Sequence, residues 1–327
     1  MSLAPYVHAM GRGPGRARSL DRSEAEDAMR LILSGEAAPE AIGALFMLMR
    51  YRGETAGEIA GFVTAMRAGL DSWTDTGATL DWPSYAAGRS RGLPLFLLSA
   101  RLVAQAGARV LLHGWNSHQN PLADVRGALD QAGIAQAETP EAAKLAMDRD
   151  GVVYVPLEAM DARLLSLLRL REVLGLRSPV NTALRALNPA RAPATVQGVF
   201  HPPYRELQQD TGAELGEPQL LVLKGGGGEF ERNPAKPVLL YGLQDGRSYE
   251  QTIDPLLDEN RRLADPTASP GDLARIWSGR LDDEFARATI LGTGALALVA
   301  AGIAPDIAAA ETRAAALWSD RQGAAAA

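Results

Sequence analysis

The apolar positions of the first seventy residues recur every three or four residues, which predicts a group of amphipathic helices. Asp21 with Glu24 and Thr55 with Glu58 have the spacing of capping boxes, so we expect a helix to begin after each pair. The apolar stripes are Ala25, Ala28, Met29, Ile32 and Leu33, then Ile42, Leu45, Phe46 and Met49, then Ile59, Phe62, Val63 and Met66. Stripes of this kind pack into a core, so residues 1–73 are expected to form a small helical domain.

From about Leu80 the pattern changes to short apolar runs that alternate with helical stretches. The expected strands are residues 110–114, 152–156, 196–200, 220–222 and 238–241, and the expected helices include 93–106, 124–131, 162–174, 290–301 and 307–317. This alternation predicts an α/β fold with a central, mostly parallel sheet flanked by helices. Residues 74–327 are assigned to this larger domain, and a segment near 157–187 is expected to join the helical domain.

Two loops follow predicted strands and are candidates for a ligand site, because ligands of such sheets bind beyond the carboxyl ends of the strands. The first, residues 113–120, is crowded with histidine, asparagine and serine side chains. It is either a ligand-facing loop or an ordinary connection that its own polar side chains cap. The second, residues 224–231, contains Lys224 and four consecutive glycines. A strand, a cation and a glycine-rich turn suggest a phosphate site, but a flexible surface loop has the same sequence signature.

Composition narrows the classes of function. The apolar fraction of 46% is sufficient for a real core, and the net charge of −6 argues against a polybasic nucleic-acid binder. Three of the 33 basic residues are lysines, and the remaining 30 are arginines, which bind phosphate and carboxylate in a bidentate manner. A GC-rich genome would produce the same bias, so the informative feature is local clustering. Basic clusters lie at Arg12, Arg16 and Arg18, and at Arg89 and Arg91.

Several other classes are excluded or unsupported. The absence of cysteine rules out disulfides, thiolate nucleophiles and cysteine-ligated metals. No apolar run has the length of a membrane span, and the first residues lack a signal-peptide core, so a cytoplasmic location is expected. The chain contains no Walker, HExxH or GxSxG motif.

Taken together, several stretches resemble the anthranilate phosphoribosyltransferase family, also called glycosyltransferase family 3. Residues 32–38, 42–45 and 52–62 resemble its N-terminal helical domain, and His113-Gly114 resembles its HGN loop. Arg171, then Gly175-Leu176-Arg177, then Asn181 and Leu187-Asn188-Pro189 resemble its R…GxRTxFN…GPLxNP segment, and the chain from residue 295 onward fits its C-terminal helices. The matches occur in the family's order along nearly the whole chain.

This resemblance implies a substrate class and a site. In the family, phosphoribosyl pyrophosphate (PRPP) lies between a helical and an α/β domain, a GTGGD loop cradles the pyrophosphate, and an Asp-Glu pair holds magnesium. The HGN loop and an arginine hold anthranilate. Carried over to matching positions, the expected ligand-binding residues are His113, Gly114, Asn116, Arg171, Arg177, Gly88, Ser99 and Lys224.

The sequence departs from the family pattern at positions that the family's chemistry requires. The GTGGD loop corresponds to residues 85–89, which keep Gly88 but lose the aspartate. In the KNTxNxST segment, residues 93–99, only Ser99 remains as a match. The magnesium pair falls near Phe230 and Glu231, so an aspartate has become apolar, and Glu229 and Glu231 are the remaining candidate metal ligands.

One subgroup shows this kind of loss. Residues 224–234 and the basic N-terminal arm resemble the YbiB-like branch, in which nucleic-acid binding by a dimer has been proposed. We therefore expect a homodimer that binds nucleic acid non-specifically through Arg12, Arg16, Arg18, Arg89 and Arg91 and that lacks anthranilate phosphoribosyltransferase activity. The alternative is an active phosphoribosyl- or glycosyltransferase that uses PRPP and Mg²⁺ with an unknown acceptor. A paralogue kept as a structural partner also remains open.

Overall fold

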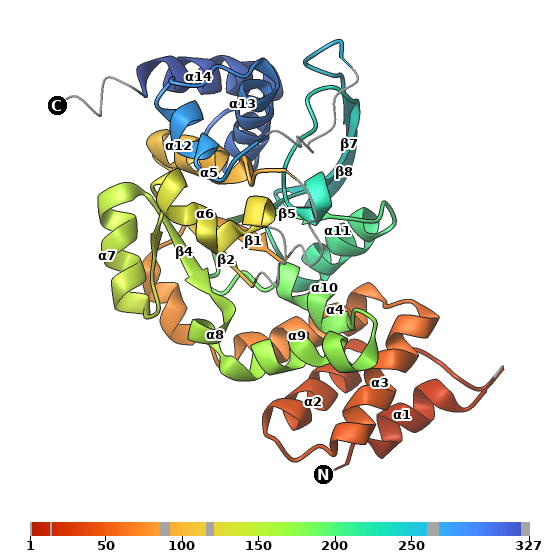
Figure 1. Cartoon of the computed structure of the whole chain (residues 1–327). Coiled ribbons are helices and arrows are strands. Elements are labelled where there is room, and N and C mark those ends of the chain that lie inside the picture. Colours follow the sequence, from red (N-terminus) through yellow and green to blue (C-terminus); the bar gives the residue numbers. More distant parts are fainter. Residues whose placement is uncertain (1, 14, 86–91, 116–120, 260–267, 322–327) are drawn as a thin grey trace.

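The computed structural model describes residues 2–13, 15–85, 92–115, 121–259 and 268–321 of the 327-residue chain (Figure 1). It begins with four helices, α1 (Ala4–Gly11), α2 (Arg22–Leu33), α3 (Pro39–Arg52) and α4 (Ala56–Arg67). The capping boxes are present at both predicted positions, because Asp21 and Thr55 accept hydrogen bonds from the N–H groups of Glu24 and Glu58. The chain later returns to this region through α8 (Leu157–Met160), α9 (Ala162–Leu174) and α10 (Pro179–Arg185).

Within the described residues, eight strands form one sheet in the order β3-β4-β2-β1-β5-β6-β7-β8. The strands are β1 (Leu80–Ser84), β2 (Val110–Gly114), β3 (Ala135–Gln136), β4 (Val152–Pro156), β5 (Ala194–Val199), β6 (Gln219–Lys224), β7 (Val238–Gln244) and β8 (Arg247–Ile253). Strands β1 to β6 pair in parallel, and β7 and β8 add an antiparallel edge. The predicted α/β class with a mostly parallel sheet is therefore confirmed.

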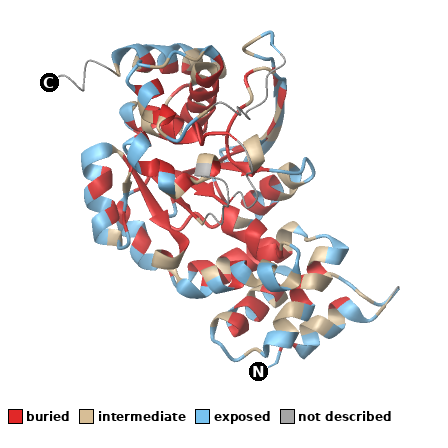
Figure 2. Ribbon diagram, in the orientation of Figure 1, coloured by how far each residue is buried: buried red, intermediate tan, exposed pale blue. Residues whose placement is uncertain are grey.

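Helices cover both faces of the sheet, and buried residues concentrate in the strands between them (Figure 2). The helices of this part of the chain are α5 (Phe96–Gln105), α6 (Val125–Ala132), α7 (Pro140–Asp150), α11 (Tyr204–Leu215), α12 (Asp272–Trp277), α13 (Glu284–Ala300) and α14 (Ile307–Asp320), of which α12 and α14 pack mainly on other helices. Short 3₁₀ turns lie at η1 (Asp71–Thr76), η2 (Pro121–Ala123) and η3 (Gly226–Gly228). Alternate residues of β1, such as Leu80 and Trp82, pack with α5 and α13, whereas Leu111 and Val153 on the opposite face join the core that contains the N-terminal helices.

Some boundaries differ from the sequence-based prediction for identifiable reasons. Helix α5 begins at Phe96, not at residue 93, because the Glu231 carboxylate accepts the Phe96 N–H at 2.9 Å. Helix α13 begins six residues earlier than expected, where the Asp283 side chain accepts from the Ala286 N–H. Strand β8 was not predicted because it is an exposed edge strand with little apolar alternation. No helix in the described part of the chain has both the length and the apolar character to cross a bilayer.

Candidate anion-binding site

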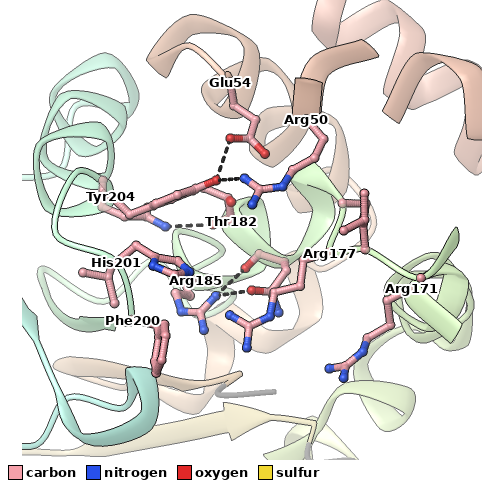
Figure 3. A pocket seen from close by; sticks show the side chains of 15 residues that line it. Arg50, Glu54, Arg171, Arg177, Thr182, Arg185, Phe200, His201 and Tyr204 are labelled. Atoms are coloured by element: carbon pink, nitrogen blue, oxygen red, sulfur yellow. Dashed lines mark hydrogen bonds between the residues drawn. The ribbon is translucent and has the colours of Figure 1, made fainter. Parts of the chain in front are cut away.

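A cavity of about 380 Å³ lies where the N-terminal helices meet the carboxyl end of β5. Its wall is built from α3 and the residues after it, the end of α9, α10, the end of β5 and α11. Figure 3 shows the side chains of Arg50, Arg171, Arg177 and Arg185 around this space. Segments that are far apart in the sequence therefore bring cationic side chains to one cavity.

The cavity carries an excess of positive charge. Within the described residues, Glu54 is the one carboxylate among the side chains that line it. Burial lowers the pKa of the Arg177 guanidinium, and the neighbouring Arg171 and Arg50 lower it further. One guanidinium nitrogen of Arg171, Nη1, is buried and has no hydrogen-bond partner among the described residues. These features fit a bound anion, which would relieve the mutual repulsion and accept the unused Arg171 hydrogen bond.

Arg185 is the buried base of this cluster. Its Nε donates to the Gly198 carbonyl at 3.0 Å and its Nη2 donates to the Tyr85 carbonyl at 2.9 Å, while Nη1 donates to the backbone and side-chain oxygens of Asn181. Burial lowers the pKa of Arg185 to about 10, with Glu229 opposing and Arg177 adding to the shift. The guanidinium is thus charged at neutral pH and oriented by neutral acceptors, and it adds positive charge to the cavity wall although the Glu229 carboxylate also interacts with it.

Glu54, the one carboxylate that lines the cavity, accepts a hydrogen bond from the Tyr204 hydroxyl. Arg50 donates from Nη1 to the Tyr204 hydroxyl at 2.5 Å, and that hydroxyl donates to Oε2 of Glu54 at 2.9 Å (Figure 3). Burial raises the pKa of Glu54. Burial and the nearby Glu54 carboxylate together raise the pKa of Tyr204 to about 12. This chain of hydrogen bonds joins the helical part to α11 and holds Arg50 at the edge of the cavity.

The remaining wall combines an aromatic ring with an unused acceptor. Phe200 is 41% exposed, and the Arg177 guanidinium lies over its ring at 6.0 Å from the centroid. Gln208 is 1% exposed, and its Nε2 donates to the Thr182 carbonyl at 3.0 Å. That bond sets the orientation of the amide and leaves Oε1 buried without a partner among the described residues.

The glycine run forms a close-packed turn behind this wall. The N–H groups of Gly225, Gly226, Gly228 and Glu229 donate to backbone carbonyls of the chain, at 3.2 to 3.3 Å. A Cβ at Gly198 would lie 2.0 Å from the Glu229 carbonyl carbon, so the turn packs directly on β5. A phosphate cradle needs N–H groups that point to the ligand, and these four are engaged. Lys224 is exposed at the end of β6 and does not line the cavity.

Of the residues predicted to bind ligand, Arg171 and Arg177 line the cavity, whereas His113, Gly114 and Ser99 do not. The Ser99 hydroxyl donates to the Ile290 carbonyl at 3.0 Å in the core. Gly114 is required by packing, because a Cβ there would lie 2.0 Å from the Ser84 carbonyl oxygen. Gly88 and Asn116 lie outside the described residues.

His113 is completely buried and belongs to a polar network at the ends of β1 and β2. Its Nδ1 lies 2.8 Å from the Tyr85 hydroxyl, and its Nε2 lies 3.1 Å from Oδ1 of Asp81. Thr195 donates to the second oxygen of Asp81 at 3.0 Å. The described geometry therefore assigns His113 to the support of the strand ends, and a ligand contact by its side chain remains a prediction.

Both candidate metal residues take part in structural hydrogen bonds. Glu231 caps α5, and Glu229 accepts a hydrogen bond from the Ser84 hydroxyl at 3.0 Å. Phe230 between them is fully buried and meets the Trp82 ring edge-on at 5.4 Å. No group of three or more acidic or histidine side chains in the described segments is arranged to hold a metal ion.

Of the predicted nucleic-acid arginines, Arg12, Arg16 and Arg18 lie in the described part of the chain. Arg12 and Arg16 are exposed near the end of α1, where Arg12 lies 3.4 Å from Nδ1 of His8. Arg18 binds Glu24 through both terminal nitrogens, at 2.5 and 2.6 Å, so its charge is neutralised locally. Arg89 and Arg91 lie outside the described residues.

Sequence reasoning missed Arg50, Arg185, Phe200, Tyr204 and Gln208. Arg50 reads as an ordinary basic residue in the last turn of a helix, and Gln208 lies in a polar helix without a motif. Arg185 lies in the segment from residue 177 onward that resembles the family, but nothing in its sequence context shows that its side chain is buried beside the cavity.

Comparisons with known proteins agree with this architecture. Residues 5–69 match the helical bundle domain of the glycosyl transferase family. The chain is 31% identical over 305 residues to the anthranilate phosphoribosyltransferase of Geobacillus stearothermophilus, and the match covers 89% of this chain and 87% of that protein. The Geobacillus kaustophilus (strain HTA426) enzyme is 29% identical over 302 residues, again covering 89% and 87%.

Solved structures show the same fold at lower identity. Anthranilate phosphoribosyltransferase from Thermus thermophilus superposes with a TM-score of 0.79 at 22% identity, covering 98% of this chain and 95% of that one. The Saccharomyces cerevisiae enzyme in complex with PRPP and Mg superposes with a TM-score of 0.71 at 16% identity and the same coverage. The extent of the sequence match, together with the shared fold, shows that this chain belongs to the anthranilate phosphoribosyltransferase family.

Proposed function

We propose that this chain binds a small, phosphate-bearing anion in the cavity and does not catalyse magnesium-dependent phosphoribosyl transfer to anthranilate. The observation that carries the proposal is the convergence of Arg50, Arg171, Arg177 and Arg185 on one confined space. A confined cavity suits a small ligand, whereas a polymeric nucleic acid requires a continuous basic groove. Phosphate is favoured because several arginines can share its oxygens.

Loss of the family reaction is supported by the state of the three residues that follow the glycine turn. Both carboxylates have structural hydrogen bonds, and Phe230 fills the position expected for a magnesium-binding aspartate with a buried ring. Magnesium prefers octahedral oxygen ligation and is usually held by carboxylates together with substrate phosphates. Rebuilding such a site here would require breaking the helix cap on α5 and opening the core around Trp82.

Calorimetry and thermal unfolding with pyrophosphate, ribose 5-phosphate and PRPP, each with and without Mg²⁺, test the proposal. We expect binding that does not depend on magnesium and that Arg171→Ala weakens about 10- to 150-fold, the effect of losing one charge-assisted hydrogen bond. Arg169→Ala is the matched control on the same helix, because Arg169 is exposed and pairs with Glu172 at 3.2 Å. Absence of binding by all three compounds would contradict the proposal.

An active phosphoribosyltransferase with an unknown acceptor is the alternative. It is favoured by the retained fold and by Arg171 and Arg177, which line the cavity as the family resemblance implies. It requires PRPP binding that strengthens with Mg²⁺ and release of pyrophosphate when the acceptor is supplied. Formation of phosphoribosyl anthranilate from PRPP and anthranilate would directly overturn the proposed loss of activity.

Nucleic-acid binding by a YbiB-like homodimer is a second candidate. It is favoured by Arg12 and Arg16, which are exposed and form no ion pair with a carboxylate among the described residues. The net charge of −6 and the neutralised Arg18 oppose it. Single-stranded DNA binding that falls steeply with salt, weakens in Arg12→Ala/Arg16→Ala and accompanies a dimeric mass in light scattering would support it. No binding at low salt would exclude it.

A cytoplasmic location remains a sequence-based prediction.

A further inference from the structure

We infer that the ligand of this cavity is a nucleoside monophosphate, with its phosphate at Arg171 and Arg177 and its base beside Phe200. This inference rests on the proposed function and makes it more specific. Four arginines account for an anion but not for an exposed phenyl ring and a buried amide acceptor in the same wall. Those two features call for a ligand that carries a planar group and a hydrogen-bond donor in addition to its phosphate.

The exposed ring of Phe200 beside Arg177 offers a stacking surface, here called the slot. The Arg177 guanidinium lies over the phenyl ring at 6.0 Å. Where arginine stacks directly on an aromatic ring in this protein, the distances are shorter: 3.6 Å for Arg321 over Trp318 and 4.3 Å for Arg101 over Trp277. Arg177 therefore does not stack directly on Phe200, and the 41% exposed ring remains available to a planar group that Arg177 can also contact.

Gln208 adds a requirement for a hydrogen-bond donor on the ligand. Its side chain lines the cavity, and its buried Oε1 has no partner among the described residues. A buried acceptor without a partner is costly, so a ligand N–H or O–H that reaches it gains selectivity over a ligand that lacks one. Heterocyclic bases present such donors on their edges, whereas inorganic phosphate fills only the arginine end.

The two ends of the cavity differ in chemistry in the way a nucleotide does. Arg171, with its unused Nη1, lies away from Phe200, and Arg177 lies between them (Figure 3). A phosphate near Arg171 would place an attached sugar past Arg177 and a base toward Phe200. Arg177 would then contact both the phosphate and the face of the base, which arginine can do because its guanidinium is planar and charged.

Calorimetry with AMP, UMP, ribose 5-phosphate, inorganic phosphate and anthranilate tests the inference on the full chain. We expect the nucleotides to bind at least tenfold more tightly than ribose 5-phosphate, since stacking of one base changes affinity by roughly 5- to 150-fold. Phe200→Leu should remove that advantage and Phe200→Tyr should keep it, while the affinity for ribose 5-phosphate stays the same in both. Gln208→Met should weaken nucleotide binding, and Glu206→Gln, an exposed change on the same helix, should not.

The outcomes separate this inference from the proposed function. If ribose 5-phosphate binds and the nucleotides bind no better, the nucleotide assignment is wrong but the anion site stands. If anthranilate binds more tightly than either nucleotide, the slot serves an aryl carboxylate and the inference is overturned. If none of the phosphate compounds binds, both proposals fail. Circular dichroism and thermal unfolding of each variant verify that the fold is intact.

Discussion

Replacing Phe230 with aspartate restores the residue type expected of a magnesium site, yet we expect it to destabilise the protein without restoring metal binding. Phe230 is fully buried and packs against Trp82, so the space around it is core. Removing a buried phenyl ring costs about 3–5 kcal/mol of unfolding free energy. A buried carboxyl without partners costs roughly another 1–3 kcal/mol even after it takes up a proton.

These contributions amount to most of the stability of an ordinary domain, which is about 5–15 kcal/mol. Phe230→Asp should therefore lower the urea midpoint severely or leave the protein unfolded at 25 °C. Phe230→Leu is the matched control, because it keeps most of the volume and loses chiefly the aromatic pair, worth about 0.5–1.5 kcal/mol. Urea titrations followed by circular dichroism give the free energy of unfolding of both variants when the two curves are fitted with the same dependence on urea concentration.

The refuting result is specific. If the free energy of unfolding of Phe230→Asp lies within about 1 kcal/mol of that of the unmodified chain, residue 230 is not part of the core and the packing argument fails. If Mg²⁺ with PRPP raises the midpoint of Phe230→Asp but not that of Phe230→Leu, the position faces a ligand site that needs only a carboxylate to bind metal. The described geometry predicts neither result.

Three further predictions follow from the described contacts. Glu231→Ala should lower the unfolding free energy by about 1–2 kcal/mol in a denaturant titration, since it removes the carboxylate that accepts the Phe96 N–H; an unchanged midpoint would show that the cap is not needed. Arg67→Met should cost about 3–5 kcal/mol because it leaves Glu217 buried without its ion pair, and adding Glu217→Gln should recover part of that loss; a single variant as stable as the unmodified chain would contradict this. The affinity for ribose 5-phosphate should rise between pH 5 and 7 as its monoester becomes a dianion, with a pKa of about 6, then fall above about pH 10 as Arg185 loses its proton; calorimetry across that range tests the sign, and an affinity that stays level past pH 10 would exclude a role for the Arg185 charge.

The secondary structure was largely predictable because its signals are local. Capping boxes at Asp21 and Thr55, the apolar run at β2 and the glycine stop after α9 each involve residues within a few positions of one another. One error arose where a distant residue sets a boundary, as Glu231 does for the start of α5, and others arose at a local cap, Asp283 of α13, and at the exposed edge strand β8. The family resemblance then ordered these elements into a fold that the sheet topology confirms.

The candidate site was predictable only in part, because sequence motifs indicate position along the chain but not exposure. Arg171 and Arg177 lie at the cavity, as the resemblance implied, whereas the His113 side chain is buried against Asp81 and Tyr85. The glycine run suggested a phosphate cradle, but the N–H groups of Gly225, Gly226 and Gly228 donate to the chain's own carbonyls.

By itself, the sequence determined the fold class, the helical start of the chain and the loss of an aspartate before Glu231, because those features depend on residue type and local spacing. Tertiary structure decided which charges meet. Arg50, Arg171, Arg177 and Arg185 come from three helices and a loop, and only the packing of the N-terminal helices and α9–α10 against the sheet brings them around one cavity. Electrostatic interactions act through space, so the function they support cannot be read from the order of residues along the chain.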